Sequence, residues 1–280
     1  MNFRRTGLLI GALLCSVGAF ADLPKEHLIP GGLALFELGQ SKQPPVVRYN
    51  NQQVLVYAHG GANGQAPEWT AAIGIPLDAK PGQSSATYGN QKLTFTIGSH
   101  KYAEQRLQVQ NKHVNPDPKA MERINTEAAR MGKIFKSFNK PEAQTWPQMI
   151  WPAEGPLSSP FGLRRFFNGE ERNPHTGLDI AAKRGSRIVA PADGVIRDTG
   201  DFYFNGNTVM IDHGQGMITM FCHLDRIDVK PGQVVHQGDM VGIVGATGRA
   251  TGPHLHWTLS MNNARVDPRL VLPPHPSEKK

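Results

Sequence analysis

The stretch GPHLHWTLS, residues 252–260, decides the fold of the second half of the chain. Its apolar residues alternate with polar ones, as in a β-strand with one face in a core. Residues two apart in a strand share a face, so His254 and His256 point the same way, roughly 6.5 Å apart. Leu255 and Trp257 then face the opposite side, where a core would hold them. One of the two histidines can bind a metal ion while the other stands beside the water on that ion.

Two further motifs place ligand-type residues in the same half of the chain. They are HTGLD at residues 175–179 and FCHLD at residues 221–225. In the first motif, Pro174 and Gly177 argue against a helix and favour a loop that enters a strand near Asp179. Imidazole and carboxylate groups are the nitrogen and oxygen ligands that zinc prefers. The clustering therefore predicts a metal site rather than isolated polar residues.

The most favoured ligand set is His175, Asp179 and His256 around one zinc ion. Two histidines and a carboxylate leave the fourth position open for water, which is the catalytic rather than the structural pattern. The HExxH motif, which would supply a glutamate base, does not occur in the sequence. A histidine such as His223 or His254 must then handle the proton, and the ordinary histidine pKa of about 6.5 suits this role.

The remaining candidate residues receive structural interpretations. His213 lies in a DHG triplet typical of a hairpin and is expected to be structural. His236 and His275 have no ligand-type neighbours in the sequence, so we expect both to be exposed. Cys222 alternates with His223 along its strand and is expected to be a small buried apolar residue rather than a nucleophile.

The strand pattern continues on both sides of the HxH stretch. Short apolar runs, separated by turns that contain Gly or Pro, recur from residue 146 to residue 272. Expected strands cover residues 187–190, 194–197, 208–211, 217–223, 234–235, 240–244 and 254–260. Glycine and proline in nearly every connection favour a compact twisted antiparallel β-sheet over a parallel sheet covered by helices. We therefore predict a mainly β domain at residues 146–272 and a short tail at 273–280.

The part of the chain at residues 22–110 shows a second series of short strands. They are expected at 33–38, 53–57, 71–75 and 92–97, with turn residues between them. This spacing predicts a small antiparallel β-sandwich of immunoglobulin-like size. No motif with catalytic chemistry occurs in it, so a positioning or substrate-guiding role is expected.

A helical connector is predicted between the two β-domains, at residues 111–145. The sequence NPDP at 115–118 is a helix-entry signal, and the following twenty residues are rich in Ala, Glu, Lys, Arg and Met. Apolar residues at Met121, Ile124, Ala128 and Met131 follow the 3.6-residue period of an amphipathic helix. We expect this apolar stripe to pack against one of the two β-domains.

The first residues have the pattern of a secretory signal. Two arginines occur within residues 1–5, an apolar run follows at 7–20, and AFA stands at 19–21. This order of charged, apolar and small residues predicts cleavage after Ala21. The apolar run is shorter than the roughly 20 residues of a membrane-spanning helix. We therefore expect an exported protein without a membrane anchor after cleavage, located in the periplasm or, alternatively, secreted.

The overall composition limits the classes of partner and of metal site. The chain of 280 residues has a formal net charge of +7 and two cysteines. Two cysteines cannot make a disulfide framework or a thiolate zinc knuckle. The basic balance favours an anionic partner, such as nucleic acid, a membrane surface or an acidic polymer. No motif supports nucleic acid, and an exported basic protein points to the anionic cell wall polymer.

The combination of these motifs resembles the lysostaphin-type (LytM-like) zinc metallo-endopeptidase family of murein hydrolases. The resemblance covers about residues 147–272 and rests on SSPFGLR at 158–164, on HxxxD at 175–179 and on GPHLH at 252–256. It implies a twisted antiparallel sheet crossed by a groove, also known as the duplicated hybrid motif. The N-terminal β-module and helix are similar to those of one exported Gram-negative branch of the family.

The resemblance also implies roles for individual residues. It implies zinc ligands at His175, Asp179 and His256. It implies that His223 and His254 are catalytic, orienting or deprotonating the water and stabilising the oxyanion. Some family members have lost ligands and only activate amidases, but all five expected positions are filled here.

The sequence thus predicts an exported zinc endopeptidase that hydrolyses peptide bonds in peptidoglycan stems or cross-links. With no wall-sorting signal, the direct link between D-Ala and diaminopimelate is the favoured bond. A catalytically silent regulator that binds the cell wall or an amidase is the alternative. A basic module that binds anionic polymers, or a secreted protease for protein substrates, would also fit the sequence.

Overall fold

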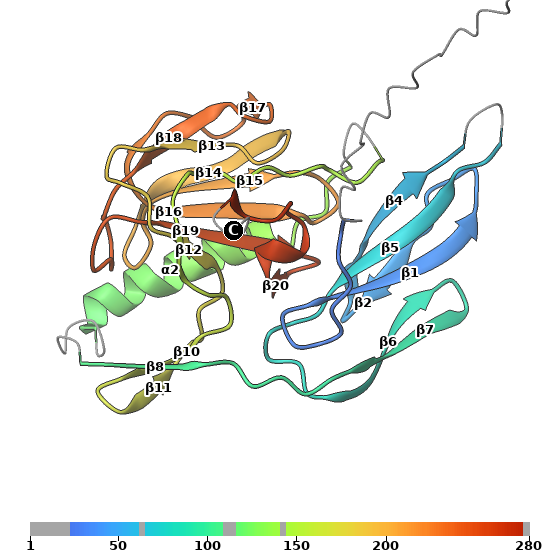
Figure 1. Cartoon of the computed structure of the whole chain (residues 1–280), viewed down its shortest axis with the longest axis horizontal. Helices are drawn as coiled ribbons and strands as arrows, with labels where there is room; N and C mark the ends of the chain where they lie inside the picture. The colour runs from blue at the N-terminus through green and yellow to red at the C-terminus, as the bar shows by residue number, and fades with distance from the viewer. Residues whose placement is uncertain (1–22, 62–64, 109–115, 141–143, 277–280) are drawn as a thin grey trace, which may run out of the picture.

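The described part of the chain forms two β units that lie side by side, with one long helix against the larger unit (Figure 1). The computed structural model describes residues 23–61, 65–108, 116–140 and 144–276. The predicted export signal and the first residues of the predicted connector lie outside these ranges. The mainly β class predicted from the sequence is confirmed. Among the described helices, none is long and apolar enough to cross a membrane.

The N-terminal unit consists of two small sheets that share one core. Buried side chains from both sheets, including Val47, Trp69, Ile73 and Phe95, pack between them, as expected for a sandwich. The strand β6 was not predicted because most of its side chains are polar and only Ala86 is buried. Within the described residues, one sheet has the order β1 (Leu33–Gln40), β5 (Glu68–Gly74), β4 (Leu55–His59), and the other has β3 (Gln52–Gln53), β2 (Val47–Tyr49), β6 (Gly82–Tyr88), β7 (Gln91–Ile97).

The C-terminal unit is built on one large twisted sheet in which neighbouring strands run antiparallel, as predicted. One face of this sheet covers the main apolar core, which includes Val209, Phe221, Trp257 and Leu259. In the described residues, the main path is β17 (Val234–Val235), β14 (Gly194–Phe202), β15 (Gly206–Asp212), β16 (Ile218–Ile227), β19 (Leu255–Met261), β12 (Leu178–Ile180), β9 (Leu157–Ser159). Pairing off this path are β13 (Arg187–Val189), β18 (Met240–Val244) and β20 (Ala264–Val266), and a short 3-10 helix η1 (Pro268–Leu270) follows.

The predicted amphipathic helix is present as α2 (Pro118–Phe135). The carboxylate of Asp117 accepts a hydrogen bond from the backbone N–H of Ala120 at 2.8 Å and caps the helix, as the NPDP signal predicts. The C-terminal turns pack on the second face of the large sheet through Phe135, which is buried against Met210, Ile218, Met220 and Cys222. Met121, expected on the packing stripe, is 40% exposed, because the first turns extend past the apolar part of this face.

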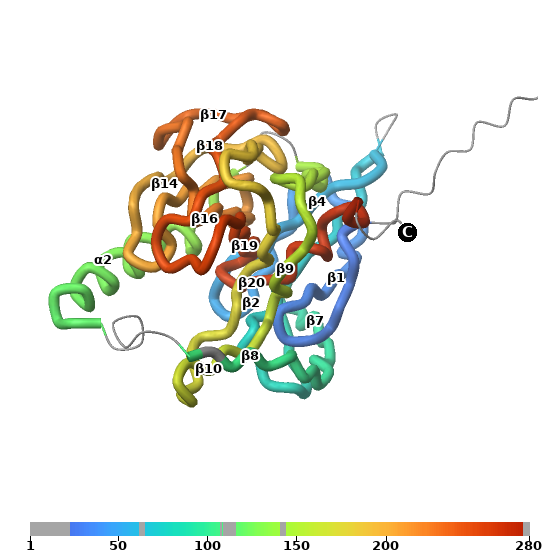
Figure 2. Tube along the Cα trace, turned by 60° about the vertical axis from the view of Figure 1, so that its left-hand side comes forward, coloured from blue at the N-terminus to red at the C-terminus, as the bar shows by residue number. Residues whose placement is uncertain are grey.

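A small third sheet joins the two units below the large sheet (Figures 1 and 2). After β7 the chain forms β8 (Glu104–Leu107), which pairs parallel with β10 (Arg164–Phe167). The next strand, β11 (Glu170–Arg172), completes a hairpin with β10. This pairing links residues about sixty positions apart, so local sequence patterns do not reveal it. It holds the hairpin at the side of the C-terminal unit where the HTGLD motif begins.

Two side-chain amides fasten the edge of the N-terminal unit to the C-terminal unit. The amide oxygen of Gln215 accepts from the N–H of Val56 at 3.0 Å, and its nitrogen donates to the Val56 carbonyl at 2.8 Å. Asn262 makes the same pair of bonds with Gly74, at 2.7 and 3.0 Å. All four bonds are buried. Each amide therefore supplies the two hydrogen bonds that a neighbouring strand would otherwise provide to these backbone groups.

Replacing Gln215 by Met tests this fastening. The side chain keeps its length but loses both hydrogen bonds, which leaves the Val56 N–H and carbonyl buried without partners. We expect the free energy of unfolding, measured by urea denaturation, to fall by about 1–3 kcal/mol. Gln83→Met, at an exposed position of β6, is the matched control and should change it by less than about 0.5 kcal/mol. Equal stability of the two variants would contradict the fastening role.

Candidate metal centre

The site is organised by a row of residues that face one another across three strand pairs. Asp179 in β12 lies directly opposite His256 in β19, and on its other side Asp179 pairs with Ser159 in β9. His256 in turn pairs with Cys222 in β16. Residues directly opposite in a sheet have their side chains on the same face. Asp179 and His256 therefore point together from the face opposite the main core.

The third member, His175, is held by the segment that precedes it in the chain. Its backbone N–H donates to the carbonyl of Leu163 at 2.9 Å, and its carbonyl accepts from the N–H of Gly162 at 2.8 Å. Its ring Nδ1 donates to the carbonyl of Pro160 at 2.8 Å. That bond fixes the ring so that Nε2 carries a lone pair and faces Asp179. The SSPFGLR motif thus has a structural use, since it positions His175.

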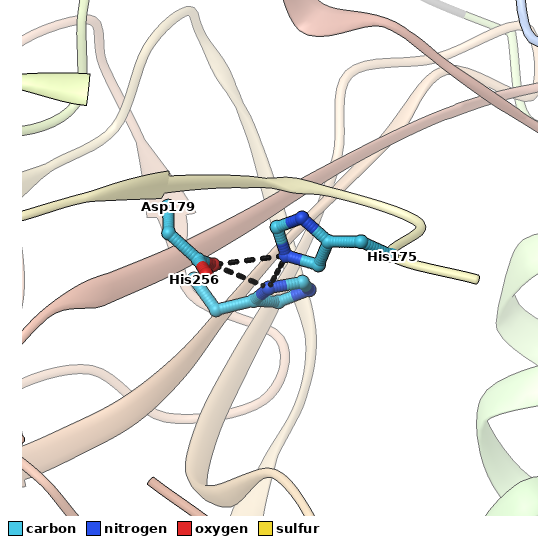
Figure 3. Close-up of side chains that lie close together, drawn as sticks. All are labelled: His175, Asp179 and His256. Carbon is cyan, nitrogen blue, oxygen red and sulfur yellow. Dashed lines mark hydrogen bonds and ion pairs between the residues drawn. The ribbon is translucent and has the colours of Figure 1, made fainter. Parts of the chain in front are cut away.

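Three ligand-type atoms converge on one point (Figure 3). His175 Nε2 lies 3.0 Å from Asp179 Oδ1 and 2.9 Å from His256 Nδ1, and the last two atoms are 2.9 Å apart. His256 Nε2 is 3.0 Å from the hydroxyl of Thr258, which orients the second ring. Lone pairs of a fixed imidazole and a carboxylate that face each other repel unless a cation or proton lies between them. The donor set of two imidazoles and one carboxylate fits a zinc ion with an open fourth position.

The charge states of these groups suit metal binding. Burial alone would raise the pKa of Asp179, but interactions with the neighbouring His175 and His256 hold that pKa well below its usual range. Burial lowers the pKa of His256, against the opposing effect of Asp179. Asp179 is therefore ionised and His256 neutral at neutral pH. These are the protonation states that a metal ion requires of its ligands.

His223 reaches the site through a β-bulge. Along β16 it follows Cys222, so strict alternation would turn its side chain into the main core. The pairing with β15 instead shifts between Phe221 and Leu224, with one extra residue on β16. His223 adopts a φ of +66°, in the left-handed region that few non-glycine residues occupy. The bulge turns the imidazole to the metal side, with its ring centre 6.1 Å from that of His256.

His254 stands beside His223 at the beginning of β19. Their ring centres are 4.8 Å apart, and His254 Nε2 lies 4.0 Å from Asp179 Oδ1. His223 Nδ1 donates to the carbonyl of Thr247, and His254 Nδ1 donates to that of Gly252, both at 2.8 Å. Both rings thus leave Nε2 free of backbone bonds. Burial and the neighbouring histidines lower the pKa of His223 to about 4, so its Nε2 is an unprotonated acceptor at neutral pH.

The structure brings all five predicted site residues together, and it also places the remaining candidates. His213 is buried in a hairpin, where Nδ1 donates to the carbonyl of Asp193 at 2.8 Å, and the structural interpretation is confirmed. The side chain of His236 is 74% exposed, as expected. The expectation for His275 is wrong: it is 4% exposed, because its ring packs edge-on against Trp151. Cys222 is buried, and burial raises the pKa of its thiol.

Sequence reasoning missed three arginines beside the site. Arg165 in β10 places Nη2 3.8 Å from Asp179 Oδ2. Arg172 in β11 lies directly opposite Arg165, and Arg249 comes from the loop between β18 and β19. The available sequence signal was the RR pair at residues 164–165, whose first arginine is the last residue of the SSPFGLR motif. Only the pairing of strand β10 with strand β11 shows that Arg165, the second of these two arginines, faces the metal centre.

Two curated relatives match part of the chain. The "DD-carboxypeptidase/endopeptidase Mpg" of Neisseria meningitidis is 42% identical over 120 residues, which are 43% of this chain and 28% of the relative. The "Peptidoglycan DD-endopeptidase ShyC" of Vibrio cholerae is 41% identical over 125 residues, which are 41% of this chain and 29% of the relative. The aligned part is therefore less than a third of the length of either relative.

Family models and one solved structure cover more of the chain. The model for peptidase family M23 matches residues 173–268, and the model for the M23 N-terminal domain matches residues 26–100. A crystal structure of a Pseudomonas aeruginosa protein assigned to peptidase M23 is 40% identical, with a TM-score of 0.73. That likeness covers 89% of this chain and 96% of the other. With its fold, its two matched regions and its ligand cluster, the chain belongs to peptidase family M23.

Proposed function

We propose that this protein is a zinc-dependent endopeptidase that hydrolyses peptide bonds in peptidoglycan. The observation that carries the proposal is the convergence of His175, Asp179 and His256, with two further histidines beside them. The name of the Vibrio relative, a peptidoglycan DD-endopeptidase, supports peptidoglycan as the substrate. The bond proposed to be cleaved is the one between D-Ala and diaminopimelate. The name of the Vibrio relative, a DD-endopeptidase, supports this choice.

The zinc ligands in this proposal are His175 Nε2, Asp179 Oδ1 and His256 Nδ1. Zinc bound there supplies a Lewis acid for the scissile carbonyl and lowers the pKa of a coordinated water to about 7. The Pro160 carbonyl and the Thr258 hydroxyl hold the two rings in place. Such outer partners keep a ligand in the correct tautomer and orientation.

The proposed catalytic residues are His223 and His254. The unprotonated Nε2 of His223 accepts a proton from the attacking water, because its Nδ1 is already committed to Thr247. His254 Nε2 lies 4.0 Å from Asp179 Oδ1 and its ring stands beside that of His223, where an N–H at Nε2 would donate a hydrogen bond to the developing oxyanion. The division of labour between the two rings is part of the proposal.

The proposal also covers the rest of the chain. An exported protein that acts on this polymer works in the periplasm, and the signal at residues 1–21 is proposed to direct it there. Residues 22–110 form the N-terminal domain, 111–145 the connector and 146–272 the metallopeptidase domain, before the tail at 273–280. Peptidoglycan is the proposed partner of the basic surface.

One experiment tests the activity directly. Residues 22–280 are incubated with defined cross-linked muropeptide dimers, with and without a chelator, and the products are read by mass spectrometry. Cleavage that stops with chelator and returns with zinc supports the proposal. A protein that binds the dimers and leaves them intact would be a silent regulator or binder instead.

Two histidine variants test the separation of ligand and catalytic roles. His256→Ala removes one of three ligands and should lose both zinc and activity. His254→Ala should keep most of its zinc and lose turnover by about 10²- to 10⁴-fold. Metal content by mass spectrometry and muropeptide cleavage give the two readouts, and His236→Ala, at an exposed position, is the control. If His254→Ala cleaves at the wild-type rate, its catalytic role is wrong.

Gly177→Ala tests how closely the loop packs on the ligand. A Cβ at Gly177 would lie 2.7 Å from His256 Nε2 and 2.6 Å from the carbonyl of Trp257, so the ring must move. We expect zinc affinity, measured by competition with a chromogenic chelator, to fall about ten- to a hundredfold. Gly132→Ala in α2, where a Cβ meets only open space, is the control. An unchanged zinc affinity in Gly177→Ala would show that zinc binding does not depend on the position of the His256 ring seen here.

A further inference from the structure

The three arginines that sequence reasoning missed form a basic wall next to the metal centre. Arg165 and Arg172 are directly opposite each other in the β10–β11 hairpin, so both side chains leave the same face. Phe167, two residues after Arg165, shares that face. Arg249 approaches from the β18–β19 loop and places its guanidinium 5.5 Å from the ring centre of Phe167 and 4.2 Å from that of Phe204. We call Arg165, Arg172 and Arg249 the arginine wall.

The arginine wall lowers the stability of the fold. Like charges directly opposite in an antiparallel pair destabilise a sheet. Burial and the charges of Arg165 and Arg172 lower the pKa of Arg249, so the three guanidinium groups lie near one another. The side chains of Arg165 and Arg172 are only 24% and 32% exposed. A hairpin selected only for stability would not place these two cations opposite each other.

The acidic partners of Arg165 and Arg172 offset only part of the charge of this pair. Arg172 pairs with Glu170, and Arg165 lies 3.8 Å from Asp179. Asp179 is itself a proposed zinc ligand, so its charge is shared with the metal. Among the described residues, the Nε atoms of Arg165 and Arg172 are buried without a hydrogen-bond partner. The wall therefore has the charge and donor groups to bind an anion within a few ångströms of the metal centre.

The chemistry of the proposed substrate supplies such an anion at the right place. In the D-Ala–diaminopimelate link, the carbon that bears the scissile nitrogen also bears a free carboxylate. A glycine bridge has no carboxylate at that position. Guanidinium groups match carboxylates through paired, charge-assisted hydrogen bonds. A carboxylate two bonds from the scissile nitrogen would lie beside the metal centre whenever the scissile carbonyl lies on it.

We propose that the arginine wall is a specificity subsite for the free carboxylate on the amine side of the scissile bond. Arg165, the member nearest to Asp179, contacts the carboxylate, and Arg172 and Arg249 add charge behind it. This inference rests on the proposed peptidase function and adds to it the residues that select the bond. It also explains why the β8 strand holds the β10–β11 hairpin at this edge of the site.

The test compares two muropeptide dimers that differ in one group. One carries the free carboxylate of the diaminopimelate centre at the scissile nitrogen, and the other carries its amide. For the wild type, we expect kcat/KM for the free acid to exceed that for the amide about ten- to a hundredfold, chiefly through KM. This ratio should fall toward one in Arg165→Gln and Arg249→Gln, and Arg165→Lys should restore part of it.

Arg226→Gln, an exposed arginine paired with Asp228, is the matched control and should keep the wild-type ratio. If the arginines only support Asp179 or the fold, their loss lowers zinc content or both rates together and leaves the ratio unchanged, which would overturn the proposal. A wild-type enzyme that cleaves both dimers equally well would overturn it without any variant. Cleavage of neither dimer would instead refute the proposed function, and this inference with it.

Discussion

The strand register that sets Asp179 opposite His256 is the constraint on which the rest of the site depends. It places a carboxylate and an imidazole on one face of the sheet while Ile180 and Leu255, opposite each other one position along, fill the main core. A shift by one residue would bury both ligands and expose both apolar side chains. The same strand pairing thus sets both the apolar pattern that stabilises the sheet and the ligand pattern that binds metal.

Most of the ligand arrangement follows from local sequence, whereas two features depend on long-range pairing. The alternation in GPHLHWTLS correctly places Trp257 in the core, and the proline and glycine around His175 indicate the loop that carries it. The orientation of His223 could not be predicted, because alternation turns it away from the site and only a bulge with φ of +66° reverses this. His275 is expected on the surface because it has no ligand-type neighbours in the sequence. Its burial depends on Trp151, which is distant in sequence, so local patterns do not reveal it.

The N-terminal unit contributes to the site by position rather than by chemistry. Gln215 ties the edge strand β4 and Asn262 the end of the central strand β5 to the C-terminal unit, and Leu33, Leu55 and Ala72 extend the main core across the boundary. The chain then continues into β8, which fixes the hairpin of Arg165 and Arg172 beside Asp179. The sheet provides the metal ligands, and the connection between the units provides the proposed wall that reads the substrate. A family fold can in this way retain one metal chemistry and differ in the bond it selects.

In the proposed zinc-loaded protein, His175, Asp179 and His256 hold one zinc ion while His223 and His254 stand beside it unligated. A crystal structure of the zinc-loaded protein, with anomalous data collected on both sides of the zinc absorption edge, tests this most directly. We expect one strong anomalous peak about 2.0–2.2 Å from His175 Nε2, His256 Nδ1 and an Asp179 carboxylate oxygen. A peak bound by His223 or His254, or no zinc peak among these residues, would contradict it.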